Sequence, residues 1–258
     1  MSERIVRRSA GLSAGGLRAW GLILLTLGIG GRSIIQNSIL HMNTIGNAEL
    51  FEALQSNSAL MGYATVALVL QAMETCAAPI FAMLLVEGVL HTADLKKYLL
   101  RVLGCALLSE IPYNMAYSGK YLDLAGRNPV FALVLGIVML YFFRRYAGKD
   151  LKNIGIKFMV FAAAFVWSRM LNIADGQCIV ILVAVLWFFR EKKTMRSLFG
   201  FSASMLCSMF NVYYVASTMS FILIHIYNEE KGERNAVLNY LCYPLVLLCA
   251  GVAGMYLV

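Results

Sequence analysis

The fold is decided by APIFAMLLVEGVLHTADLKKYLLRVLGCALLSEIPY, residues 78–113. Two apolar runs flank a short basic segment, and they carry Glu87, His91 and Glu110. Ionisable side chains are costly at bilayer depth and usually face a protein interior or a water-filled cavity. Glu87 and His91 stand four residues apart, so they share one face of a helix. We therefore predict a functional site here, with Glu87, His91 and Glu110 as its catalytic candidates.

The composition of the whole chain indicates a membrane protein. Of its 258 residues, 60% are hydrophobic and 14% are charged, whereas soluble domains are about 45–50% apolar. Apolar runs separated by short charged clusters favour helical spans over the alternating pattern of a β-barrel. We predict an all-α polytopic transmembrane bundle over residues 17–258, embedded in a lipid bilayer and preceded by a basic cytoplasmic tail over residues 1–16.

The basic net charge does not indicate a nucleic-acid partner. The formal charge is +8, but a nucleic-acid binder would gather its Lys and Arg on one soluble face. Here they stand between the apolar runs. The six cysteines include no CxxC pair and lack metal-site spacing, so they are predicted to be packing residues, and no metal site is expected.

The positions of Lys and Arg predict the topology. Cytoplasmic loops are enriched in these residues. If the apolar run over residues 60–90 crosses once, 18 of the 22 Lys and Arg fall on the side of the N-terminus. That run is longer than one crossing needs, so a break is expected near Pro79. We predict a multi-pass protein of the cell membrane, with its N-terminus in the cytoplasm and about nine spans: residues 17–40, 60–90, 99–115, 129–143, 156–171, 178–189, 198–212, 214–227 and 236–258.

The first span has an unusual second half. It carries Gly28, Gly30, Gly31, Arg32, Ser33, Gln36 and Asn37. Such a polar segment is expected to face protein or water, and its glycines permit close helix packing or a break. The segment that follows, residues 41–58, is expected to be a loop on the far side of the membrane.

Five further polar residues are candidates for substrate binding: Arg32, Asn128, Arg169, Asp175 and His225. The two arginines either form an anion-binding pocket or pair with Glu74, Glu110 or Asp175. Asn-Pro and Asp-Gly sequences favour turns, so Asn128 and Asp175 also have a structural interpretation.

The two histidines near the basic edge also have alternatives. His91 either acts in a site or ends its helix with Glu87 as its partner, and Glu110 either contacts substrate or makes a structural hydrogen bond. His225 is expected close to the same edge, in a packing role or as a second imidazole.

The motifs PIFAMLLVEGVLHT, KKYLLR and LLSEIP within residues 79–112 resemble the core signature of the TraX family of integral membrane proteins. This family is typified by the enzyme that acetylates the N-terminus of conjugative pilin. Weaker similarities extend over most of the chain: NPVFALVLG at residues 128–136, ADG at 174–176, YNEEKG at 227–232 and YPL at 243–245.

The resemblance implies an acetyltransferase related to membrane-bound acyltransferases. Its reaction would move an acetyl group from acetyl-coenzyme A to an amine of a peptide or pilin-like acceptor. Such chemistry needs a base for the amine and donors for the developing oxyanion. On this basis His91, oriented by Glu87, would be the base, and Glu110 would position the amine.

The chain also departs from the family pattern. The family's first span usually carries an Asp-His pair where this sequence has Gly28 and Ile29, and the usual last-span His is replaced by Val246. The expected Gly-Arg pair reads Glu74 and Thr75. These departures give an alternative: a catalytically degenerate member that serves as a membrane partner in assembly or export. A small transporter is a third hypothesis, which the breaks in the spans permit.

Overall fold

A computed structural model of the chain describes residues 11–42, 45–230 and 236–256. Helices make up the architecture, and no strand occurs in these ranges apart from two isolated bridges. The predicted all-α class is confirmed for this part of the chain. Residues 1–10 of the predicted tail lie outside the described residues. The first helix begins at Ala14, capped by the Ser13 hydroxyl, which accepts a hydrogen bond from the Gly16 amide at 3.3 Å.

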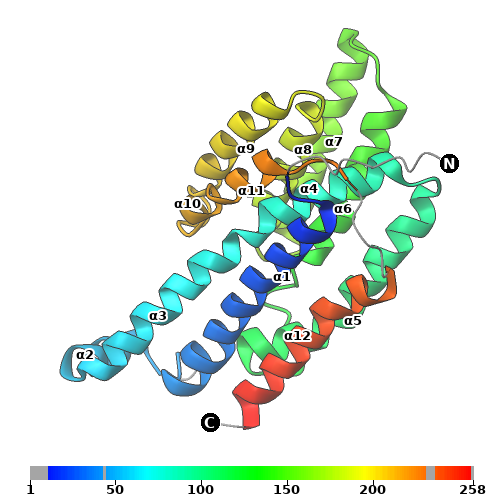
Figure 1. Cartoon of the computed structure of the whole chain (residues 1–258). Coiled ribbons are helices and arrows are strands. Elements are labelled where there is room, and N and C mark those ends of the chain that lie inside the picture. Colours follow the sequence, from blue (N-terminus) through cyan, green and yellow to red (C-terminus); the bar gives the residue numbers. More distant parts are fainter. Residues whose placement is uncertain (1–10, 43–44, 231–235, 257–258) are drawn as a thin grey trace, which may run out of the picture.

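The elements in chain order are α1 (Ala14–Gly30), the π-helix η1 (Gly31–Ile39), α2 (Asn47–Ser56), α3 (Ser58–Thr75), α4 (Ala77–His91), α5 (Leu95–Ser118), α6 (Val130–Arg145), α7 (Leu151–Met170), α8 (Gly176–Phe188), α9 (Lys193–Cys207), α10 (Tyr214–Ser217), α11 (Ser220–Ile226) and α12 (Ala236–Tyr256). Figure 1 shows α1 beside α3 and α12 beside α5, and both pairs are packed in contact. Helices α10 and α11 pack on α9, and this group contacts the rest of the bundle through α9 on α8, α10 on α3 and α11 on α4.

Three helical stretches in the described ranges are long and apolar enough to cross a membrane: Ala14–Ile39, Ser58–His91 and Leu151–Met170. Shorter apolar helices span Gly176–Phe188, Tyr214–Ile226 and Tyr240–Tyr256. These helices are compatible with a membrane protein. By length and composition, three spans are supported within the described ranges, whereas about nine are predicted from the sequence.

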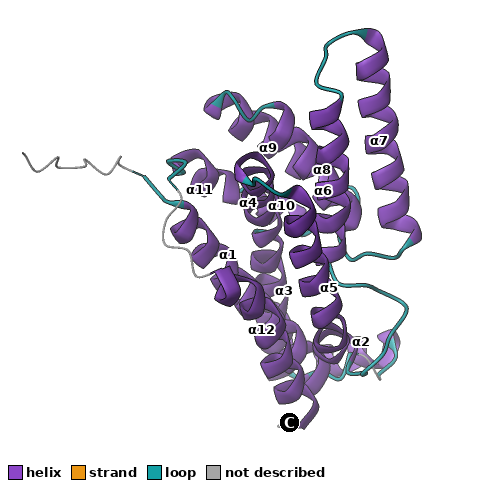
Figure 2. Ribbon diagram, turned by 90° about the vertical axis from the view of Figure 1, so that its right-hand side faces the viewer, coloured by secondary structure: helices purple, strands orange, loops and turns teal. Residues whose placement is uncertain are grey.

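Helix α7 has the surface expected of a lipid-facing helix. It stands at the edge of the bundle, packed on α6 and α8 (Figure 2). Its large apolar side chains point outward: Phe158 is 69% exposed and Met159 is 70% exposed. Large exposed apolar surfaces mark contact with a partner or a membrane.

The long second apolar run is broken, as predicted. Helices α3 and α4 meet at Cys76, three residues before Pro79. A proline has no amide hydrogen for the carbonyl four residues back, and its ring clashes with that carbonyl, which here belongs to Thr75. The break is held by side chains: the Ser220 hydroxyl donates to the Cys76 carbonyl at 2.6 Å, and the Thr75 hydroxyl donates to the Tyr213 carbonyl at 2.9 Å.

The polar half of the first span faces protein, as predicted. At Gly31 the α-helical pattern gives way to the π-helix η1. The Ser33 hydroxyl donates to the Ala250 carbonyl of α12 at 2.7 Å, and the Asn37 amide donates to the Ala116 carbonyl of α5 at 2.9 Å. These bonds satisfy polar groups that lipid could not satisfy.

Two expectations from the sequence were wrong in detail. Residues 41–58 are not wholly a loop, because they contain α2, whose first turn carries Glu49, a favourable charge near the positive end of the helix dipole. The span expected over residues 214–227 is two short helices, α10 and α11. Between them the Ser217 and Thr218 hydroxyls each donate at 2.7 Å to a backbone carbonyl three residues back, which competes with regular helix formation.

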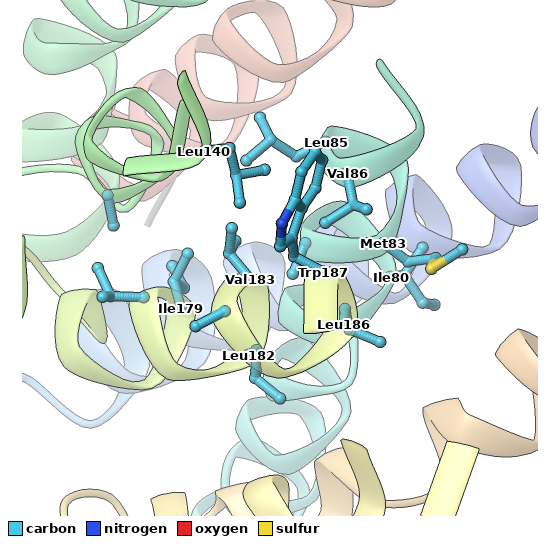
Figure 3. Packing of buried hydrophobic residues seen from close by; sticks show 14 of the residues in the cluster. Ile80, Met83, Leu85, Val86, Leu140, Ile179, Leu182, Val183, Leu186 and Trp187 are labelled. Carbon is cyan, nitrogen blue, oxygen red and sulfur yellow. The ribbon is translucent and has the colours of Figure 1, made fainter. Parts of the chain in front are cut away.

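The core surrounds α8. Figure 3 shows Leu182, Val183 and Leu186 of α8 near Ile80 of α4 and Leu140 of α6. All five are at most 1% exposed. A helix that is apolar on every side belongs in the interior, so α8 provides a rigid wall against which α4 and α6 are packed.

Candidate functional site

A cavity of about 450 Å³ lies between α1, α3, α4, α5, α6, α8, α10 and α12, within the size range of small-molecule sites. We call one end the mouth, formed by Arg18, His91, Thr92, Ala93 and Arg101, and the other end the floor, formed by Glu74, Thr75, Asp175, Tyr214 and Tyr243. The mouth and the floor are separated by the length of α4, which is about 22 Å for 15 residues at 1.5 Å per residue.

The predicted Glu87–His91 pair lies at the mouth, where α4 ends. The Nδ1 atom of His91 is 2.9 Å from the Glu87 carbonyl oxygen and 3.2 Å from the Glu87 carboxylate. A neutral imidazole that donates its Nδ1 hydrogen there keeps Nε2 as an acceptor. His91 lines the cavity with a side chain that is 45% exposed, whereas Glu87 contacts His91 without lining the cavity.

Two arginines make the mouth positive. Arg18 comes from α1 and Arg101 from α5, and both line the cavity. Guanidinium groups suit phosphate and carboxylate ligands because they offer paired donors. Neither arginine was predicted as a site residue, because from the sequence both served only as indicators of topology.

The loop between α4 and α5 fixes the shape of the mouth. Asp94 caps α5 by accepting a hydrogen bond from the Lys97 amide at 3.0 Å. This bond holds the pKa of Asp94 below its ordinary value, with a smaller contribution from the Lys97 charge. The cap sets the start of the helix that carries Arg101.

At the floor, Glu74 contacts two side chains, those of Tyr117 and Arg32. The Tyr117 hydroxyl donates to Glu74 Oε1. Arg32 Nε lies 4.0 Å from Glu74 Oε2, and the Arg32 guanidinium lies over the Tyr117 ring at 4.8 Å. Pairing with Glu74 was one of the alternatives for Arg32, and it is the contact observed. Glu74 Oε2 and Arg32 Nε have no hydrogen-bond partner among the described residues.

Gly28 makes room for Glu74. A Cβ atom at Gly28 would overlap the Glu74 side chain. The resemblance implies an acidic residue at position 28 and a glycine at position 74. In this chain the two are exchanged, so the carboxylate is that of Glu74 on the facing helix α3. Ile29 and Val246 stand where the resemblance implies histidines, and both belong to one apolar cluster.

Two tyrosines add unpartnered hydroxyls to the floor. Tyr214 is 0% exposed and Tyr243 is 9% exposed, and both line the cavity. Neither hydroxyl has a hydrogen-bond partner within the part of the chain that the structure describes. Leaving a buried hydroxyl unsatisfied costs about 1–3 kcal/mol, so such groups indicate a ligand or bound water.

Asp175 belongs to two cavities. It stands before α8 with φ 52°, and the Asn211 amide donates to its carboxylate at 2.9 Å. It lines the floor, and it also lines a second cavity of about 510 Å³ together with Arg169 and Asn211. The structure thus places two predicted binding residues, Arg169 and Asp175, on the second cavity.

Glu110 and Asn128 contact each other instead of a cavity. The Asn128 backbone and side-chain amides donate to Glu110 Oε2 at 3.2 and 2.7 Å. The Asn128 side chain also donates to the Ala106 carbonyl at 2.8 Å and accepts from the Val130 amide at 3.0 Å. These bonds fix the turn before α6, and neither residue lines either cavity.

His225 lines neither of the two cavities. Its Nδ1 is 3.1 Å from the Ser197 hydroxyl, which links α11 to α9. Within residues 11–42, 45–230 and 236–256, no group of three or more His, Cys, Asp and Glu could hold a metal ion.

Sequence reasoning missed most of the floor. From the sequence, Glu74 was considered as a possible partner of an arginine and as a departure from the family pattern, and Tyr243 only as part of YPL. Nothing in the pattern around Tyr214 signals a site. A charged residue inside a membrane-length apolar run is the sequence signal that could have identified Glu74 as a site residue.

The fold and the cavity define a class: a helical protein with apolar membrane-type spans and, between them, a ligand-sized cavity with apolar walls and polar groups at its two ends. Comparison with family models matches the TraX family, described as TraX protein, over residues 41–253. The match covers most of the chain, so the chain belongs to the TraX family. Comparisons with curated proteins and with solved structures find no match. Gly28 and Ile29 lie before the matched region.

Proposed function

We propose that the protein is an acetyl-coenzyme A-dependent N-acetyltransferase that acts on the amine of a peptide or pilin-like acceptor. The observation that carries the proposal is the cavity, which joins a mouth with two arginines to a floor with two carboxylates. A transferase needs a place for an anionic donor and a place for an amine in one enclosure. Membership of the TraX family supports the same chemistry.

The mouth suits the donor. Arg18 and Arg101 can hold the phosphates of acetyl-coenzyme A, which enters as a substrate. The walls between mouth and floor include Phe81, Leu84 and Leu133, apolar side chains that suit the neutral arm of the donor. The donor would thus lie along the cavity with its thioester directed inward.

The reaction needs a group that takes a proton from the amine, and the cavity offers one at each end. His91, oriented by Glu87, is the group that the sequence predicts. Glu74 is the group that the tertiary structure adds. Glu110 has a supporting role in this proposal, because its bonds to Asn128 fix the start of α6, which lines the cavity.

The proposal includes a multi-pass topology in the cell membrane. We place the N-terminus and the mouth on the cytoplasmic side, where acetyl-coenzyme A is available. Arg144 and Arg145 end α6 and Lys193 begins α9, and on this topology these basic residues lie on the same side as the mouth, as the positive-inside rule requires. The path through α1, α3–α4, α5, α6, α7, α8, α9, α10–α11 and α12 then gives about nine crossings.

The second candidate is a non-catalytic partner in membrane assembly or export. The observation that favours it is the apolar cluster that contains Ile29 and Val246. Two positions where the resemblance expects imidazoles are packed with hydrocarbon, which cannot transfer protons.

The test uses the purified full chain with labelled acetyl-coenzyme A and a set of peptides with free N-termini. We expect a labelled amide, and we expect binding of coenzyme A that weakens as salt concentration rises. A peptide with a blocked N-terminus is the matched control. Absence of both a labelled product and coenzyme A binding would exclude the enzyme and favour the assembly or export partner.

A further inference from the structure

We propose that the floor of the cavity is the binding site for the ammonium group of the acceptor, and that Glu74 accepts its proton. This inference rests on the proposed function and adds the location of the reacting amine. The residues that form the site are Glu74, Asp175, Tyr214 and Tyr243, with Arg32 behind Glu74. The group that takes the proton from the amine is then Glu74 at the floor and not His91 at the mouth.

The charges at the floor leave a place for one cation. Glu74 and Asp175 are carboxylates on the cavity surface, and Arg32 is the basic side chain beside Glu74. With all three ionised, two negative charges against one positive charge leave one unit of negative charge. A buried charge is stable only when it is paired, and a primary ammonium supplies the missing charge together with three donors.

The unpartnered atoms give independent support. Glu74 Oε2 and the hydroxyl oxygens of Tyr214 and Tyr243 lack hydrogen-bond partners among the described residues. All three side chains line the floor. Glu74 Oε1 accepts from Tyr117, whereas Oε2, 4.0 Å from Arg32 Nε, has no hydrogen bond. This arrangement resembles a site prepared for a polar ligand more than a packed apolar core.

Glu74 Oε2 takes one proton from the ammonium group, and the neutral nitrogen attacks the thioester carbonyl of acetyl-coenzyme A. A C–N bond forms, and the Tyr214 and Tyr243 hydroxyls donate to the oxyanion. The C–S bond then breaks, and the leaving sulfur takes the second proton from nitrogen. The products are the acetamide and the coenzyme A thiol, and Glu74 releases its proton to solvent.

The experiment measures amine binding without acetyl-coenzyme A. The full chain in lipid nanodiscs is titrated calorimetrically with n-butylamine, and with N-butylacetamide as the neutral control. We expect saturable binding of the amine and none of the amide. Glu74→Gln should weaken amine binding at least tenfold, whereas Glu52→Gln, the same change on an exposed residue of α2, should leave it unchanged.

Equal binding of amine and amide, or normal amine binding by Glu74→Gln, would overturn the site. If Glu74→Gln does not fold, the Tyr214→Phe/Tyr243→Phe double variant decides, because it removes only the two hydroxyls. We expect weaker binding in the double variant, with the exposed Tyr63→Phe as its control, and unchanged binding would overturn the proposal.

The two proposals fail in different ways. Amine binding without any acetyl transfer leaves the floor as a cation site and removes the enzyme. Acetyl transfer that persists in a Glu74→Gln variant unable to bind n-butylamine removes the floor site and leaves the enzyme.

Discussion

The mouth and the floor of the cavity carry similar side chains in opposite surroundings. At the mouth, His91 is 45% exposed and contacts Glu87. At the floor, Tyr214 is fully buried, and Glu74, 18% exposed, lies against Arg32 and Tyr117. Water screens charges at an exposed site, whereas a buried charge depends on its few neighbours. Substitutions should therefore have small effects at the mouth and large effects at the floor.

This difference also concerns how the groups are positioned. The mouth pair is local, since four residues on one helix bring Glu87 and His91 together. The floor and the side chains that hold Glu74 come from five elements: Arg32, Glu74, Tyr117, Tyr214 and Tyr243 lie on η1, α3, α5, α10 and α12. A site of this kind is rigid only when all of those elements are packed together.

The largest expected effect is on catalysis at the floor. Glu74→Gln should lower kcat for acetyl transfer by roughly 100-fold or more, since general base catalysis contributes about 10²–10⁴-fold. Single-turnover kinetics with labelled acetyl-coenzyme A would measure it, with Glu52→Gln as the control. Normal kcat in Glu74→Gln together with a loss in His91→Ala would place the chemistry at the mouth.

The next effect is on the packing that holds the floor. Gly28→Ala should reduce the free energy of unfolding by about 1–3 kcal/mol, because the new methyl group overlaps the Glu74 side chain. Gly30→Ala is the matched control, since a Cβ there has nothing within 4 Å. Thermal unfolding of both variants would measure the difference, and equal midpoints would show that the α1–α3 contact is looser than the structure indicates.

A smaller effect is expected at the mouth. Arg101→Gln should raise KM for acetyl-coenzyme A by about tenfold and leave kcat nearly unchanged, because a charge-assisted hydrogen bond contributes about 1.5–3 kcal/mol and solvent reduces that value here. Steady-state kinetics would separate the two parameters. Lys120→Gln, an exposed change just beyond α5 at its other end, is the control, and an unchanged KM would remove Arg101 from the donor site.

The smallest effect is on the loop at the mouth. Asp94→Ala should slightly lower the thermal midpoint, because the cap on the Lys97 amide is lost. The folded pKa of Asp94 is depressed, so its stabilisation is present above the ordinary value of about 4 and is lost as pH falls through the lower folded value. The difference between wild type and variant should therefore shrink under acid, and a difference that grows there would contradict the cap.

The structure also shows where a carboxylate lies in place of the aspartate that the resemblance implies at position 28. Position 28 is a glycine, and the Glu74 side chain occupies the space that Gly28 leaves. Such an exchange between facing helices is invisible in a single sequence, because it depends on which residues are neighbours. The apolar packing of Ile29 and Val246 shows no similar exchange for the imidazoles.

The sequence by itself determined the all-helical class, the family, the break near Pro79 and the inward-facing polar half of the first span. These depend on local composition, on proline geometry and on the high cost of polar groups in lipid, which any single segment reveals. Only the tertiary structure decided that Glu110 binds Asn128, that Arg32 lies beside Glu74, and that Tyr214 and Tyr243 lie at one floor with Asp175. Those contacts join helices far apart in the chain, and the packing of the whole bundle determines which residues meet.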